Sequence, residues 1–513
     1  MKNLLITISL FLTSLCLTAQ APSIEWQKSL GGSGWDFAYS IQQTIDEGYV
    51  VAGYSNSTDT LGDVTSNHGG NDYWVVKLSY TGDITWQKSL GGTGDDEARS
   101  IQQTADSGYI VAGYSKSING DVTGNHGNSD FWVVKLDSVG NIEWQKSIGG
   151  TGWDGAEYIQ QTTDGGYIVT GASYSTNGDV TGNHGNGDYW VVKLDSMGVL
   201  EWQKSLGGSG WDYPRCIKQT IDGGYVVAGL SASTNGDVTG NHGNSDFWIV
   251  KLDSIGVVEW QKSLGGTGDD SAHSIIQTSD GGFVVAGSSS STNGDITGNI
   301  GFRDYWVVKL NSSGVLDWEK CFGGTGDDQA FSIQQTSDFG YIVTGLSYST
   351  NGDVTDNHGN ADYWVVKLDS LGIIEWQKSL GGTGDDFGQS IQQTIDDEYV
   401  VAGQSISLNG DITFNNGNSD YWVVKLSSTV GVNEIIELND FSVYPNPTSN
   451  QITLKTNNQL IGAFYTIYDN MGKTVISGQI NAAQTVIELG NLSGGIYLFS
   501  VGENKQSFKV IKN

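Results

Sequence analysis

Residues 130–148 read DFWVVKLDSVGNIEWQKSI, and both halves of this stretch recur along the chain. The first half, or a close variant, places tryptophans at Trp74, Trp132, Trp190, Trp248, Trp306, Trp364 and Trp422. The second half places them at Trp26, Trp86, Trp144, Trp202, Trp260, Trp318 and Trp376. The spacing is 58 residues throughout, apart from 60 between Trp26 and Trp86. A repeat of this length decides the architecture before any local propensity does.

One repeat unit reads as four short strands, at residues 98–104, 109–114, 131–136 and 142–147. These segments are rich in β-branched and aromatic residues, and Gly, Asp and Asn separate them. No segment keeps a helical period over three turns. Four antiparallel strands in each of seven units are typical of the blades of a β-propeller.

The two ends of the repeat array complement each other. Residues 24–30 form a fourth strand without its first three, and residues 421–426 form a third strand without its fourth. A β-solenoid would instead need fewer residues per coil and capping units at both ends. Pairing the two end strands completes a blade and removes two exposed edges. We therefore predict an all-β chain whose residues 22–428 form a seven-bladed β-propeller closed by the N-terminal strand.

Composition narrows the class of protein. The 513 residues carry a formal charge of −32, and 11% of them are aromatic. The aromatic content excludes general disorder. The lack of a basic face excludes a nucleic acid partner.

Strand spacing keeps Cys216 of a first strand too far from Cys321 of a fourth strand for a disulfide. We expect both thiols to be unpaired.

The N-terminal residues 1–21 have the layout of a secretory signal peptide. Lys2 precedes an apolar run from Leu4 to Leu17, and small residues follow at Thr18 and Ala19. The run is too short to span a bilayer comfortably. No later stretch is long and apolar enough, so the chain is predicted to leave the cytoplasm and not to span a membrane.

The composition changes after Leu426. Residues 429–440 read as a linker, and residues 441–513 carry YPNP at 444–447, LSGGIYL at 492–498 and KVIK at 509–512. These strings resemble the C-terminal sorting domain of the type IX secretion system of Bacteroidota. The resemblance implies the type IX secretion machinery as a partner, and a secreted or outer cell-surface location. From the residues alone, the short strands here predict a small immunoglobulin-like β-sandwich.

Two loops of each unit emerge on one face of the predicted propeller, which we call the long-loop face. They are the connection between the second and third strands and the link between blades, and such loops commonly bind ligands. Trp35, Trp153 and Trp211 occupy one link position. Other blades have Asp95, Asp269, Asp327 and Asp385 there, and exchange with Asp suggests exposure. These tryptophans either stack on a sugar ring or cover a loop.

The long loop suggests a cation site. Asp121, Asn125, Asn128 and Asp130 offer the hard oxygen atoms that calcium prefers, although the spacing is not that of an EF-hand and such loops also simply turn. The loop histidines His68, His126, His184, His242 and His358 are replaced by Ile300 and Asn416 in two blades. A metal-binding or catalytic ring would not accept isoleucine, so we interpret the histidines as turn residues.

Four turns repeat Asp-Ser followed by an aliphatic residue. The pattern resembles the O-glycosylation acceptor of Bacteroidota, and a plain turn is the alternative. The serines are Ser138, Ser196, Ser254 and Ser370.

No acid, base or nucleophile is unique to one blade, since each candidate recurs. The largest departures from the repeat are at 213–215, 302–303 and 414–416. We therefore predict a non-catalytic secreted or cell-surface scaffold that binds a glycan or protein ligand. The alternative is a secreted hydrolase or lyase with a site on the long-loop face.

Overall fold

The computed structural model describes residues 21–58, 62–427, 441–444, 448, 450–456, 461–469, 473–501 and 506–512. The chain divides into two compact units, Met1–Thr429 and Val430–Asn513. All but the last residue of the predicted signal peptide, and the predicted 429–440 linker, lie outside the described residues.

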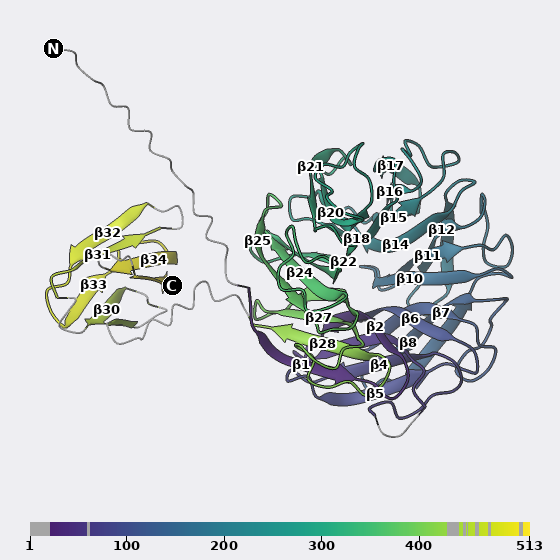
Figure 1. Ribbon diagram of the computed structural model, residues 1–513, viewed down its shortest axis with the longest axis horizontal. Helices are drawn as coiled ribbons and strands as arrows, with labels where there is room; N and C mark the ends of the chain where they lie inside the picture. The colour runs from purple at the N-terminus through teal and green to yellow at the C-terminus, as the bar shows by residue number, and fades with distance from the viewer. Residues whose placement is uncertain are drawn as a thin grey trace, which may run out of the picture. The chain divides into compact units, whose positions relative to one another are not determined.

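The first unit contains, among its described residues, seven four-stranded antiparallel sheets set around a central channel (Figure 1). The first strands, which line the channel, are β2 (Asp36–Gln43), β6 (Asp96–Gln103), β10 (Asp154–Gln161), β14 (Asp212–Gln219), β18 (Asp270–Gln277), β22 (Asp328–Gln335) and β26 (Asp386–Gln393). The second strands are β3 (Tyr49–Ser55), β7 (Tyr109–Ser115), β11 (Tyr167–Ser173), β15 (Tyr225–Ser231), β19 (Phe283–Ser289), β23 (Tyr341–Ser347) and β27 (Tyr399–Ser405). The sheets are the blades of a β-propeller, as the repeat predicts.

The outer half of each blade completes the sheet. The third strands are β4 (Asp72–Leu78), β8 (Asp130–Leu136), β12 (Asp188–Leu194), β16 (Asp246–Leu252), β20 (Asp304–Leu310), β24 (Asp362–Leu368) and β28 (Asp420–Leu426). The fourth strands are β5 (Ile84–Leu90), β9 (Ile142–Ile148), β13 (Leu200–Leu206), β17 (Val258–Leu264), β21 (Leu316–Phe322), β25 (Ile374–Leu380) and, from the N-terminus, β1 (Ile24–Leu30).

The ring closes through the two ends of the array. Strand β1 pairs antiparallel with β28, from Trp26 opposite Lys425 to Leu30 opposite Tyr421. The Trp422 indole donates to Gln27 Oε1 at 2.9 Å. One blade thus combines strands from both ends of the array, and the outer edge of β28 is covered by β1. The predicted closure is confirmed.

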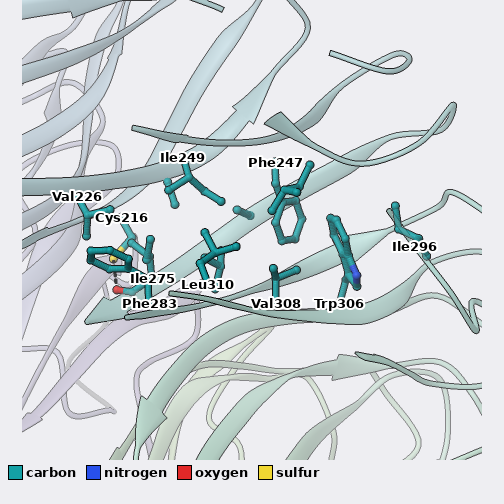
Figure 2. Packing of buried hydrophobic residues seen from close by; sticks show 14 residues of the cluster. Cys216, Val226, Phe247, Ile249, Ile275, Phe283, Ile296, Trp306, Val308 and Leu310 are labelled. Carbon is teal, nitrogen blue, oxygen red and sulfur yellow. Dashed lines mark hydrogen bonds between the residues drawn. The ribbon is translucent and has the colours of Figure 1, made fainter. Parts of the chain in front are cut away.

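The core lies between neighbouring blades. Every residue of the third strands is buried, because each strand has a blade packed against both of its faces. Figure 2 shows one such layer between β16 and β20, where the Phe247 and Trp306 ring centroids are 4.4 Å apart. Cys216 belongs to the same layer, and its Sγ donates to Ile275 O at 3.6 Å. Within the described residues Cys216 and Cys321 are unpaired, as predicted.

Buried aspartates join each blade to the next. At one junction Asp96 Oδ2 accepts from Gly92 N at 2.8 Å, and Asp121 Oδ2 accepts from Gly91 N at 3.1 Å. A Cβ atom at Gly91 would lie 2.5 Å from Asp96 Oδ2 and 2.8 Å from Asp72 Oδ1. Only glycine fits between these carboxylates. These carboxylates accept backbone N–H groups of the link and so tie the end of one blade to the start of the next.

The second unit has two antiparallel sheets among its described residues. Their strands are β29 (Phe441–Tyr444), β30 (Gln451–Thr456), β31 (Phe464–Tyr468), β32 (Thr474–Gln479), β33 (Gln484–Glu488), β34 (Gly495–Val501) and β35 (Gln506–Lys512). The orders are β29-β30-β33 and β32-β31-β34-β35, around a core that includes Ile452, Ile467 and Phe499. Two facing sheets suit a small sandwich, and its immunoglobulin type stays a prediction.

Candidate functional site

Each first strand contains a β-bulge at the same place. In β2 the register with β3 shifts between Ala38 and Ser40, so Tyr39 is the extra, unpaired residue. The other six first strands shift at the same step. The seven bulged residues are Tyr39, Arg99, Glu157, Arg215, His273, Phe331 and Gln389. A bulge re-aims side chains and is common beside functional sites.

The bulge lets two consecutive residues of a strand line the channel. Tyr39 and Ser40 both border a cavity of about 370 Å³, as do the corresponding pairs of the other six blades. In a regular strand such neighbours would point to opposite faces. The bulge lies in the half of the strand nearer the long-loop face, so we call this cavity the channel mouth. A second cavity of about 220 Å³ continues deeper, toward Gln42 and its counterparts.

The blades diverge strongly at the channel mouth, whereas their third strands hardly vary. The third strands read Asp-Tyr-Trp-Val-Val-Lys-Leu with only Phe131, Phe247 and Ile249 as exceptions. The bulged position instead holds Tyr, Arg, Glu, Arg, His, Phe and Gln in turn. A nearly symmetric scaffold therefore encloses an asymmetric cavity.

One side of the mouth is built around Arg99. Its Nη2 donates to Glu97 Oε2 at 3.0 Å, and its guanidinium lies 4.1 Å from the centre of the Tyr39 ring. It also faces Tyr114 at 5.6 Å. Burial raises the pKa of Tyr39, so this ring is a neutral platform. The guanidinium thus lies near two aromatic rings, a setting that suits arginine better than lysine.

A second, similar group surrounds Arg215. Its Nη1 lies 3.4 Å from Glu157 Oε2, and its guanidinium lies 4.5 Å from the centre of the Tyr213 ring. Tyr213 donates its hydroxyl proton to Glu157 Oε1 at 2.5 Å. Both oxygens of this carboxylate therefore have a protein partner. The arrangement fixes Glu157 and leaves other edges of Arg215 toward the cavity.

The opposite side of the mouth is uncharged. The rings of His273 and Phe331 lie 5.1 Å apart, and Gln389 and Gln329 line the same cavity. Burial, with the positive charges of Arg215 and Arg303, holds the pKa of His273 well below its usual range. The imidazole is therefore neutral at physiological pH.

Deeper in the channel, side chains tie neighbouring first strands together. Gln42 Oε1 accepts from Gln103 N at 2.6 Å, and Gln160 Oε1 accepts from Gln219 N at 2.8 Å. Lys218 and Ile276 occupy the equivalent position in two blades, where neither can accept such a bond. Lys218 Nζ instead donates to the hydroxyl of Tyr158. The blades that contain β14 and β18 therefore lack this shared acceptor.

The three tryptophans predicted to bind ligand lie beside the mouth. Trp35 and Trp211 are 44% and 45% exposed, as the exchange with Asp suggests. Trp211 and the half-buried Trp153 lie 5.7 and 6.5 Å from Tyr213, between ring centroids. Trp35 contacts Phe37 at 5.9 Å. Together with the mouth they form an aromatic shoulder, which we define as Trp35, Trp153 and Trp211.

The four residues predicted to bind calcium do not form one cluster. Asp121 Oδ2 accepts from Gly91 N, whereas a Cβ at Gly149 would meet Asp130 Oδ1 at the next junction. Asn125 Oδ1 accepts from Gly127 N at 3.0 Å, and no hydrogen bond within the described residues joins the Asn128 side chain to the other three. No group of three or more His, Cys, Asp or Glu side chains in the described ranges could hold a metal ion. Calcium binding by this set stays a prediction.

The loop histidines act as turn residues. His126 N and Nδ1 both contact Asp130 Oδ2, at 2.9 and 2.7 Å. Where histidine is missing, Ile300 N still donates to Asp304 Oδ2 at 2.9 Å. The backbone contact is therefore shared, and the imidazole only adds to it.

The serines of the Asp-Ser turns are accessible. Ser138 is exposed, and Asp137 Oδ1 beside it accepts from Val139 N at 3.0 Å and Asn141 N at 2.8 Å. Ser196, Ser254 and Ser370 are exposed in the same turn. The geometry is that of a plain turn with a free surface, and glycosylation stays a prediction.

Sequence reasoning missed the channel mouth, because it searched for inserted or unique blades. The signal was present in the sequence as one column of the repeat, the residue three positions after the aspartate that begins each first strand. Its importance depends on the bulge, which repeat spacing does not reveal.

The comparisons with known proteins identify the tail. Residues 442–513 match the family model described as the secretion system C-terminal sorting domain. The chain is thus exported by type IX secretion to a secreted or cell-surface location, as the resemblance implies. Among the described residues, no helix combines the length and apolar character needed to cross a membrane.

For the propeller the likenesses are remote. The regulatory protein FlaEY of Caulobacter vibrioides is 26% identical over 300 residues, which make up 55% of this chain and 30% of that protein. The chain thus spans less than a third of that relative. The extracellular domain of a putative one component system from B. thetaiotaomicron is 12% identical, with a TM-score of 0.41 over 96% of this chain and 58% of that one. PorZ, a surface component of the type-IX secretion system of Porphyromonas gingivalis, is 11% identical, with a TM-score of 0.34 over 90% and 65%.

Proposed function

We propose that the exported chain is a non-catalytic scaffold of the cell surface or medium, and that its propeller binds a glycan or protein ligand in the channel mouth. The observation that carries this proposal is the divergence of seven otherwise similar blades at the bulged residue facing one cavity. A rigid framework with a few variable contact residues is the common plan of binding proteins.

Exposure alone does not account for the divergence. Lys28 lies on the rim with 32% of its side chain exposed, and the equivalent residue is lysine in all seven blades. Asn119 of the long loop is exposed, yet five other blades also have asparagine there. These two exposed positions keep the repeat, so exposure does not by itself make a position diverge.

The departures from the repeat also remove shared stabilising contacts. Lys218 and Ile276 replace glutamines whose side-chain oxygens accept backbone N–H groups in the other blades. A hydrogen bond of this kind contributes about 0.5–1.5 kcal/mol to stability. Loss of stability at a cavity is expected where function requires other side chains.

The aromatic shoulder extends the proposed site. Sugar rings stack on exposed indoles, and the shoulder continues from Tyr213 at the mouth. Four blades carry aspartate at the same link position, so Trp35→Asp, Trp153→Asp and Trp211→Asp are substitutions that the fold already accepts. If the shoulder contributes, the triple variant should bind more weakly and keep its melting temperature within a few degrees.

The test is a glycan and surface-binding array with the full chain. The variant Tyr39→Gln/Phe331→Gln changes two mouth residues to the one that Gln389 already supplies in another blade. We expect binding to fall by about tenfold or more, since contact residues at the centre of a site contribute over 1.4 kcal/mol.

The matched control is Ile45→Ser/Ile221→Ser. These isoleucines are 84% and 93% exposed in the turns that follow the first strands, at the other end of the channel, where two blades already have serine. The control should bind like the parent. Equal loss in both variants, or turnover of a polysaccharide or peptide at ordinary enzymatic rates, would overturn the proposal.

A further inference from the structure

The charges that line the channel differ in sign from the chain as a whole. Over its full length the chain has a formal charge of −32. The charged residues that border the two cavities are Arg99, Arg215 and Lys218 against the single carboxylate of Glu157. A cationic cavity in a strongly acidic protein is a departure that requires an explanation.

The carboxylates beside the two arginines do not saturate them. Arg99 donates to Glu97 through Nη2, and Arg215 approaches Glu157 through Nη1. The Nε atoms of both arginines are buried without a hydrogen-bond partner in the described structure. Each guanidinium carries five N–H donors in a planar fork. Each carboxylate engages one nitrogen of its arginine, so other N–H groups of the two guanidiniums remain for an acceptor in the cavity, whereas the buried Nε atoms cannot be reached from it.

Aromatic rings lie against both guanidinium groups and restrict their movement. Arg99 lies over Tyr39 and Arg215 over Tyr213, at 4.1 and 4.5 Å. A guanidinium held flat by a ring loses little freedom when its edge binds a planar anion, and its fork matches a carboxylate in a bidentate contact. The neutral side of the mouth, with His273 and Phe331, suits an uncharged ring.

We propose that the channel mouth binds a ligand bearing a carboxylate, received by the guanidinium edges of Arg99 and Arg215, with the uncharged part of the ligand against His273 and Phe331. This inference rests on the proposed function and names the chemical class of its ligand. The carboxylate can belong to an acidic saccharide or to a free organic acid.

The test is isothermal titration of the full chain with glucuronate, glucose and succinate. We expect glucuronate to bind saturably in the millimolar range or tighter, and about tenfold or more tightly than glucose, because charge-assisted bonds to arginine are about twice as strong as neutral ones. Succinate binding equal to that of glucuronate identifies a free organic acid as the source. Weaker succinate binding identifies an acidic saccharide.

The variants Arg99→Gln and Arg215→Gln use a residue already present as Gln389 in the same ring. Each should lower glucuronate affinity about tenfold and leave glucose binding unchanged. The control Lys88→Gln removes one positive charge from the rim and should change neither. Glucose binding equal to glucuronate binding, no saturable glucuronate binding, or an equal loss in Lys88→Gln overturns the inference. Array binding of neutral glycans that the Tyr39→Gln/Phe331→Gln variant weakens would still uphold the proposed function.

Discussion

The third and first strands of each blade belong to the same repeat but are under different constraints. All residues of a third strand such as β24 are buried, whereas β22 in the same blade alternates between buried and half-buried residues around its bulge. A strand packed on both faces can change only where volume is conserved. A bulged strand beside a cavity can change freely. The comparison separates residues that keep the ring folded from residues that determine what it binds.

The largest expected effect comes from deleting residues 23–30. The deletion removes β1, exposes the edge of β28 and leaves the Trp422 indole without Gln27. We expect aggregation or loss of the cooperative melting transition, because an open edge strand pairs with other chains. Light scattering and thermal unfolding measure this. The control deletes residues 441–513, which belong to a separate compact unit, and should leave the melting transition of the propeller in place. If the 23–30 deletion stays monomeric and melts at the temperature of the parent, closure is not the main constraint on the ring.

A substitution in a third strand should cost much more than one at the mouth. Trp364 is fully buried and packs against Tyr305 at 4.6 Å between ring centroids. Trp364→Ala should lower the free energy of unfolding by about 3–5 kcal/mol. Gln389→Ala at the bulge should change it by less than about 0.5 kcal/mol. Chemical denaturation measures both, and comparable losses would contradict the separation drawn above.

Much of the framework could be predicted from the sequence, because the buried residues recur at the same positions in every repeat. The tryptophan spacing predicted the blades, and the split between residues 24–30 and 421–426 predicted the closing pair. The bulge could not be predicted, since a one-residue register shift leaves no mark in repeat length. Without it, strict alternation would place Tyr39 and Ser40 on opposite faces. The variable residues can therefore be read from the sequence, but their position around one cavity could not be predicted from it.

The junction aspartates give the framework a pH dependence opposite in sign to that of His273 at the mouth, whose lowered pKa costs stability as the pH falls through about 6.5. Burial, with the charges of Asp36 and Asp63, raises the pKa of Asp420 to about 7. Its Oδ1 is buried and has no hydrogen-bond partner in the described structure. The folded state thus holds this proton more tightly than the unfolded chain, and stability rises as the pH falls from 7.5 to 5.5, by about 2 kcal/mol for this group.

Asp420→Asn isolates that contribution. The variant should show a smaller rise in melting temperature between pH 7.5 and 5.5 than the parent. Asp106 sets the lower limit of the pH range over which stability is retained. Partial burial raises the pKa of its carboxyl, but contacts that include those with Thr104 and Lys135 together outweigh this effect and lower the pKa to about 2. Its stabilisation is lost only as the pH falls below about 4. A variant whose melting temperature changes with pH between 7.5 and 5.5 as much as that of the parent would contradict this assignment.

The smallest expected effect is also the sharpest test of the comparison. Lys218→Gln and Ile276→Gln restore the residue found in the other blades, whose side-chain oxygen accepts a backbone N–H as Gln42 Oε1 does from Gln103 N. Each should raise the free energy of unfolding by about 0.5–1 kcal/mol, the net value of one hydrogen bond. Lys218→Gln also removes a cation from the channel and should weaken glucuronate binding, whereas Ile276→Gln should not. If Lys218→Gln loses both stability and binding, Lys218 is part of the framework, and the division between scaffold and site fails in that blade.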